Sequence, residues 1–193
     1  PGGFLVAGID SPGVVNLLAR ITRTDIEIVT YGESADYAIS HVSLQPTQAH
    51  ARITKLGKVL GELSLTIPGS HNIENATAAL AAALKLGAPA ADLLVGLAHF
   101  SGAKRRFENR GIANGITVID DYGHHPTEVK VTLETAKRFA GTGKVIAIFQ
   151  PHRYSRTAMF VSEFAEVLAI ADQVFLLEVY AASEPAIPGV SSI

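Results

Sequence analysis

The sequence predicts an α/β protein with two parts, and three patterns along the chain support this. An apolar run at residues 4–9, a helical stretch after Pro12 and a second apolar run at 26–31 open the chain. Strand–helix–strand order is the unit of a parallel sheet. Residues 35–67 alternate apolar with polar or small side chains, which is typical of antiparallel strands with one solvated face. Beyond residue 102, strands and helices alternate again.

The composition is that of a globular protein that is not built to bind nucleic acid. Of 193 residues, 48% are hydrophobic and 18% are charged, and the formal net charge is -2. That balance is far from disorder, and no broad basic field would recruit nucleic acid. The chain has no cysteine, which excludes disulfides, thiolate metal sites and a cysteine nucleophile.

Targeting signals are missing from the sequence. No apolar run approaches the roughly 20 residues that span a bilayer, and no signal peptide opens the chain. We therefore expect a cytoplasmic protein with no membrane partner. Because the chain starts at Pro1 without a methionine and ends just after a strand-like run, we also expect both ends to be cut edges of a longer protein.

Two helices should close the first part of the chain. A break at residues 68–70 precedes apolar residues at helical spacing, among them Ile73, Ala76 and Leu80. Gly87 suits the carboxyl end of this helix, and Pro89 should open the next one. We place a domain boundary around residues 101–103.

The second part should be a doubly wound, Rossmann-like domain. Apolar strands are predicted at 116–119, 145–149 and 174–177, with helices between them. Pro126 sits at the favoured first position of the first helix. The second helix carries one apolar face, formed by Phe160, Phe164, Val167 and Leu168. In such folds ligands gather beyond the carboxyl ends of the strands, where this chain has its polar segments at 120–125, 150–157 and 178–184.

The first candidate site is the start of the helix after residue 69. Asn72 and Asn75 are three apart, so they share a face in the first turn. Carboxamides offer donors and acceptors, which complement an adenine edge. The alternative is that Ser70 or Asn72 only caps the helix.

The second candidate site is the polar run at residues 120–128, which follows a strand and precedes a helix. Two carboxylates, two imidazoles and a phenol lie within six residues. A carboxylate here could accept ribose hydroxyl protons or hold a metal. The alternative is a polar turn with His125 as a helix cap. A metal hydrolase built on His124 and His125 is a weaker possibility, because adjacent residues point in different directions.

The third candidate site is the run at residues 150–157. Arg153 and Arg156 can present guanidinium forks to a carboxylate or phosphate, and the start of the following helix favours anions as well. The alternative is a solvated basic turn. Anion binding is therefore the inference that the residues themselves support.

These segments together resemble the Mur ligase family. The pattern HNxxN occupies residues 71–75, and the runs at 120–128, 149–157 and 179–184 are similar to the family member that adds L-alanine. The resemblance extends over nearly all of the chain and is weakest at residues 35–67. It implies that residues 1–101 are the second half of the central ATP-binding domain. Residues 102–193 would then be the C-terminal ligase domain, truncated at its end.

The resemblance also implies an activity. Such a protein would be an ATP-dependent ligase that joins L-alanine to UDP-N-acetylmuramate through an acyl phosphate, in peptidoglycan precursor synthesis. The family's GxxGKT phosphate loop would lie upstream, so this chain alone is predicted to be inactive without the N-terminal portion of the same enzyme. The alternatives are a related ligase that recycles murein tripeptide, or a module that only binds nucleotide or another protein.

Site residues follow from the resemblance by position. His71, Asn72 and Asn75 would hold adenine, Arg106 the nucleotide phosphates and Asp121 the ribose. The muramyl carboxylate and the amino acid would be contacted by Tyr122, His124, His152, Arg153 and Arg156. The catalytic set would be Arg106, His124, His152, Arg153 and Arg156. The cofactors would be ATP and Mg²⁺, with the magnesium ligands mainly outside this chain, so no metal ligand is assigned.

Overall fold

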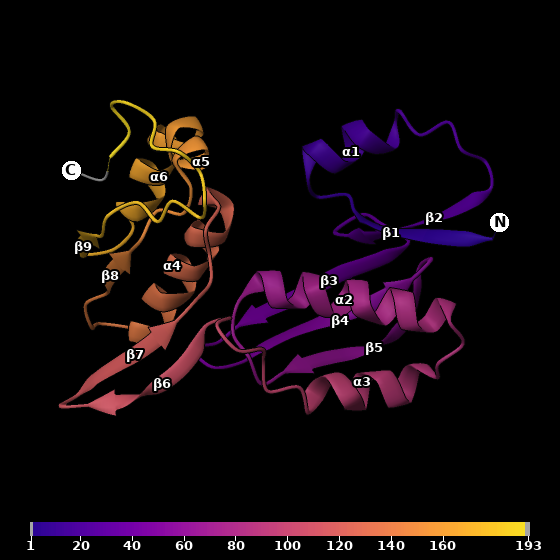
Figure 1. The fold of residues 1–193 in the computed structure, drawn as a ribbon. Coiled ribbons are helices and arrows are strands. Elements are labelled where there is room, and N and C mark those ends of the chain that lie inside the picture. The colour runs from indigo at the N-terminus through magenta and orange to yellow at the C-terminus, as the bar shows by residue number, and fades with distance from the viewer. Residues whose placement is uncertain (1, 192–193) are drawn as a thin grey trace. The chain divides into compact units, whose positions relative to one another are not determined.

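The computed structural model describes residues 2–191, which form two compact units that divide between Ser101 and Gly102 (Figure 1). Both units mix helices and strands, so the α/β class predicted from the sequence is confirmed. No helix in the described part of the chain is long and apolar enough to cross a membrane.

The first unit is built on one mixed sheet with the strand order β1-β2-β3-β4-β5. Its strands are β1 (Gly3–Gly8), β2 (Ile26–Gly32), β3 (Tyr37–Leu44), β4 (Ala49–Lys55) and β5 (Lys58–Leu65). β1 pairs in parallel with β2, and helix α1 (Pro12–Leu18) provides the crossover that parallel pairing needs. β3, β4 and β5 are antiparallel, as the alternating pattern predicted. The last turn lies at Leu56 and Gly57, both with positive φ.

Helix α2 (Ser70–Lys85) covers the sheet of the first unit with one face (Figure 1). The buried positions recur at three- and four-residue spacing, as they must on an amphipathic helix: Ile73, Ala76, Thr77, Leu80 and Ala81. They pack against buried strand residues such as Ile53 and Leu63. Burying a side chain such as Leu80 contributes about 1.5–3 kcal/mol. Helix α3 (Ala90–Ala98) follows Pro89 and packs against β5.

The second unit contains two small sheets and three helices within its described residues. Its elements are β6 (Glu108–Ala113), β7 (Ile116–Asp120), α4 (Pro126–Ala140), β8 (Ile146–Phe149), α5 (Tyr154–Met159), α6 (Val161–Leu168) and β9 (Gln173–Leu176). β8 and β9 pair in parallel. Helices α4 and α6 pack together over a core that includes Val129, Leu133, Phe149 and Phe164.

One detail of the predicted second unit is wrong. The strand expected at 116–119 is β7, and it pairs antiparallel with β6 in a separate two-stranded sheet instead of lying beside β8 and β9. The reason is the turn between β6 and β7, where Asn114 has a φ of 51° and Gly115 a φ of 77°. Two consecutive positive φ values are the geometry of the tight hairpin turn that Asn-Gly favours.

Candidate active site

The start of helix α2 holds the first group of predicted residues. Gly69, with a φ of 102°, precedes the helix, and the side-chain Nδ2 of Asn72 donates a 2.7 Å hydrogen bond to the carbonyl oxygen of Pro68. Asn72 thus ties the helix to the preceding segment, while its Oδ1 stays available. Asn75 is exposed one turn further on, and His71 is half-buried. The two carboxamides are therefore not equivalent: one has a structural contact and the other faces solvent.

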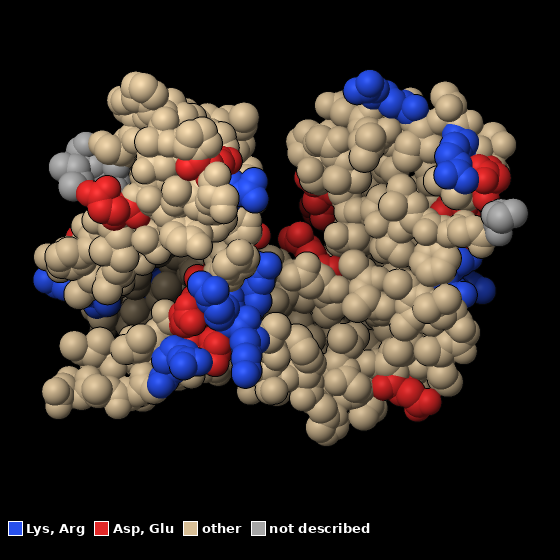
Figure 2. Space-filling view, viewed as in Figure 1, with Lys and Arg blue, Asp and Glu red and all other residues tan. Residues whose placement is uncertain are grey.

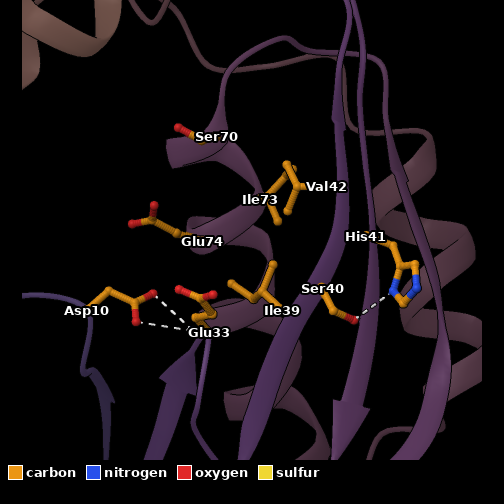
Figure 3. Close-up of a pocket in the computed structure, with 9 residues that line it drawn as sticks. All are labelled: Asp10, Glu33, Ile39, Ser40, His41, Val42, Ser70, Ile73 and Glu74. Atoms are coloured by element: carbon orange, nitrogen blue, oxygen red, sulfur yellow. Dashed lines mark hydrogen bonds between the residues drawn. The ribbon is translucent and has the colours of Figure 1, made fainter.

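A pocket in the first unit was missed by the sequence reasoning (Figure 3). It has a volume of about 290 Å³, and Asp10, Glu33 and Glu74 gather on one side of it. Asp10 accepts hydrogen bonds from the backbone N–H of Glu33. Burial and the nearby charge of Asp10 raise the pKa of Glu74. These carboxylates come from three separate segments, so no local motif in the sequence signals them.

The polar run after β7 is organised by its two inner carboxylates. Asp121 accepts the backbone N–H of Phe107 through Oδ2 at 2.9 Å and that of Gly123 through Oδ1 at 2.7 Å. Glu128 Oε2 accepts the backbone N–H groups of His124 at 3.0 Å and His125 at 3.1 Å. Both carboxylates thereby fix the backbone that presents Tyr122 and His124.

His125 is a helix cap, as the simpler interpretation of this segment predicted. Its side chain accepts the backbone N–H of Thr127, and together with Glu128 it forms a capping box at the start of α4. Its ring also contacts Phe160, with centroids 4.8 Å apart. No group of three or more His, Asp or Glu side chains within residues 2–191 is arranged to hold a metal ion.

The third predicted segment lies beyond the carboxyl ends of β8 and β9. The segments after these strands meet, because Arg153 N–H donates to the carbonyl oxygen of Tyr180 at 2.8 Å. Glu184 accepts both the backbone N–H and the hydroxyl of Ser155, at 3.0 and 2.7 Å. These bonds fix the first turn of α5, on which Arg156 is carried.

Rings from three segments form a row in the second unit. Tyr122 contacts His124 with centroids 5.0 Å apart, His124 and His152 are 6.2 Å apart, and His152 and Tyr180 are 5.3 Å apart. Arg156 Nη1 lies 3.4 Å from Nδ1 of His152. The structure thus brings together the predicted residues Tyr122, His124, His152 and Arg156, which the chain separates by as many as 34 positions.

The positive charge beside this row of rings comes from Arg153 and Arg156 and not from His152. Burial and the positive charges of Arg156 and Arg153 lower the pKa of His152, which keeps its ring neutral at pH 7. The hydrogen bonds from Ser155 lower the pKa of Glu184, so this carboxylate is ionised. A neutral imidazole beside guanidinium groups suits the binding of a carboxylate or phosphate.

A second basic group lies near the start of β6, where Lys and Arg side chains alternate with acidic ones (Figure 2). Arg106 Nη1 is 3.6 Å from Glu128 Oε1, and the Arg105 guanidinium lies over the Tyr122 ring at 4.7 Å. Arg106 is half exposed and connects to the site through Glu128.

Comparison with known proteins identifies the family of this chain. Residues 1–83 match the Mur ligase middle domain, and residues 105–188 match the Mur ligase, glutamate ligase domain. The chain belongs to the Mur ligase family.

Similar proteins in this family include alanine-adding enzymes. A UDP-N-acetylmuramate–L-alanine ligase of Kineococcus radiotolerans is 47% identical over 191 residues, which are 99% of this chain and 41% of that protein. One from Agrobacterium fabrum is 45% identical over 198 residues, covering 98% and 41%. The crystal structure of the corresponding ligase from Thermotoga maritima matches with a TM-score of 0.69 and 38% identity, over 79% of this chain and 34% of that one. The chain thus spans about two fifths of the length of these curated relatives.

The sequence left several contributors to this candidate site without a role. Glu128 and Ser155 lie inside the predicted polar runs, yet only their contacts reveal what they do. Tyr180 and Glu184 lie in the polar segment at 178–184, to which no role of its own was assigned from the sequence. A carboxylate three residues after His125 at a helix start is the sequence signature of a capping box, and this signal could have identified Glu128.

Proposed function

We propose that this chain is part of an ATP-dependent ligase that joins L-alanine to UDP-N-acetylmuramate in the cytoplasm, in peptidoglycan precursor synthesis. The observation that carries the proposal is the match of 97–99% of the chain, at 41–47% identity, to proteins named for that reaction. A murein peptide ligase from Psychrobacter arcticus is 25% identical. The identity to the alanine-adding ligases is higher than the identity to the murein peptide ligase, which favours alanine as the amino donor.

The site in the second unit supports the proposal chemically. An acyl-phosphate ligase must neutralise a carboxylate while it accepts phosphate and then stabilise the tetrahedral intermediate formed by the amine. Arg153 and Arg156 beside neutral His152 offer that positive charge. Tyr122 and His124 complete the wall of the site. We assign the muramyl carboxylate and the alanine to these five residues.

We assign ATP to five of the residues that the resemblance names. Asn75, with Asn72 and His71 beside it, would bind adenine, whose edge offers the donors and acceptors that a carboxamide complements. Arg106 would reach the phosphates. Asp121 uses one lone pair of each oxygen for backbone N–H groups, and it would use another for a ribose hydroxyl. ATP would supply the phosphoryl group that activates the muramyl carboxylate.

The test is an assay of a full-length protein that contains these residues, with UDP-N-acetylmuramate, ATP and either L-alanine or a murein tripeptide. We expect ADP release that depends on L-alanine and a product heavier by one alanine residue. Release driven by tripeptide and not by alanine would assign the chain to the recycling reaction instead. The 193-residue chain, whose sequence contains no GxxGKT run, should release no ADP, and alanine-dependent release by it would contradict this expectation.

A further inference from the structure

The ring of His124 is held in one tautomer by its own segment. Its Nδ1 lies 3.0 Å from the backbone carbonyl oxygen of Tyr122. A carbonyl oxygen can only accept a hydrogen bond, so Nδ1 must carry the hydrogen. In its neutral form His124 therefore has an unprotonated Nε2, and 31% of the side chain is exposed.

A carboxylate supports the protonated nitrogen of this ring. Glu128 Oε2 lies 3.5 Å from Nδ1 of His124 while it accepts the backbone N–H groups of His124 and His125. Partial burial raises the pKa of Glu128, but these two hydrogen bonds and the charges of His124 and Arg106 outweigh burial and lower it. Glu128 is thus an anion at neutral pH, and it stabilises the imidazolium that forms when Nε2 takes up a proton.

Groups of unlike charge surround His124. Glu128 of α4 lies 3.5 Å from its Nδ1, and Arg106 contacts that carboxylate. The His152 ring lies 6.2 Å from the His124 ring, and Arg156 lies beside His152. Tyr122 of its own segment completes the surroundings. An amino acid zwitterion matches this order, with its carboxylate toward the arginine and its ammonium toward His124.

We propose that His124 accepts the proton of the incoming amino group and that Glu128 is its positioning residue. This inference rests on the proposed ligase function. Nε2 of His124 takes one proton from the ammonium, and the freed lone pair attacks the acyl carbon. The C–N bond forms, the bond from that carbon to the phosphate oxygen breaks, and phosphate leaves with the electron pair. The second nitrogen proton leaves with the phosphate as hydrogen phosphate, and His124 returns its proton to water.

The Glu128→Gln variant distinguishes a positioning role of Glu128 toward His124 from a purely structural role. Glutamine keeps an oxygen that can accept the two backbone N–H groups, but it removes the charge beside Nδ1. In the full-length protein we expect kcat to fall about tenfold or more. We also expect the acid limb of the kcat/KM profile to move to lower pH, because the imidazolium has lost its anion. Glu134→Gln, which removes the same charge from elsewhere on α4, should change neither quantity.

Nitrogen-15 NMR of the 193-residue chain tests the tautomer without any assay of activity. At pH 8 we expect the hydrogen of His124 on Nδ1, and a hydrogen on Nε2 would overturn the proposal. A fall in kcat for Glu128→Gln with an unmoved acid limb would leave Glu128 as a backbone support only and would also overturn it. If the unaltered full-length protein forms no alanine amide, the proposed function fails and the role of His124 falls with it. If the full-length protein is an active alanine ligase but either test of His124 gives the contrary result, the proposed function stands and only the role proposed for His124 and Glu128 is refuted.

Discussion

Asp121→Ala should destabilise the second unit by about 2 kcal/mol. The carboxylate accepts the N–H of Phe107 at 2.9 Å and that of Gly123 at 2.7 Å, and alanine leaves both donors without this partner. An unsatisfied donor costs about 1–3 kcal/mol, and the lower end applies because the residue is only half-buried. The Phe107 bond also ties down a segment with positive φ at Arg105 and Phe107, which is unfavourable for these side chains.

Urea unfolding of the 193-residue chain measures this cost, and amide hydrogen exchange at Phe107 and Gly123 locates it. Asp121→Asn keeps one acceptor oxygen, so it should cost about half as much as the alanine change. Asp120→Ala is the matched control, because this neighbour makes only a 3.8 Å ion pair with Arg105 and should cost less than about 0.5 kcal/mol. Unchanged stability and unchanged exchange in Asp121→Ala would refute the assignment of both hydrogen bonds.

Three further predictions concern ligand binding, catalysis and pH. In the full-length protein, Asn75→Ala should weaken ATP binding by about 1–3 kcal/mol in calorimetry, whereas Asn72→Ala should also lower the melting temperature because it breaks the bond to Pro68. Arg156→Lys keeps the charge but loses the planar fork, so kcat should fall, and fall further in Arg156→Ala, with ATP affinity nearly unchanged. The lowered pKa of Glu184, caused by its bonds with Ser155, means that its stabilisation is present above the ordinary glutamate pKa and is lost as pH falls through the lowered value. The stability difference between the unaltered chain and Glu184→Gln should therefore shrink in acid unfolding experiments.

Local patterns predicted most of the fold. The face of α2 with Ile73 and Leu80, the start of α4 at Pro126 and the antiparallel strands after residue 35 all follow from spacing and turn residues. The β6–β7 hairpin could also have been predicted, since Asn114-Gly115 is a strong hairpin signal between two strands. The prediction for residues 116–119 was wrong because apolar content alone does not distinguish a parallel strand from one arm of a hairpin.

The geometry of the site depends on contacts between distant segments, and no local pattern encodes these. Spacing indicated that Arg153 and Arg156 could bind an anion. It could not show that His124 lies beside His152 or that Glu184 holds Ser155, because these pairs are 28 and 29 positions apart. Likewise, the polar run at 120–128 suggested ligands, whereas the structure shows that Asp121 and Glu128 hold backbone N–H groups as well.

The most direct test of the proposed chemistry follows the oxygen atoms of the muramyl carboxylate. UDP-N-acetylmuramate labelled with ¹⁸O in that carboxylate is incubated with ATP, L-alanine and a full-length protein that contains these residues, and the released phosphate is analysed by mass spectrometry. An acyl phosphate transfers one carboxylate oxygen to the phosphate, so we predict one ¹⁸O in each phosphate and one in each amide. Phosphate without ¹⁸O, formed together with the alanine amide, would contradict an acyl-phosphate ligase.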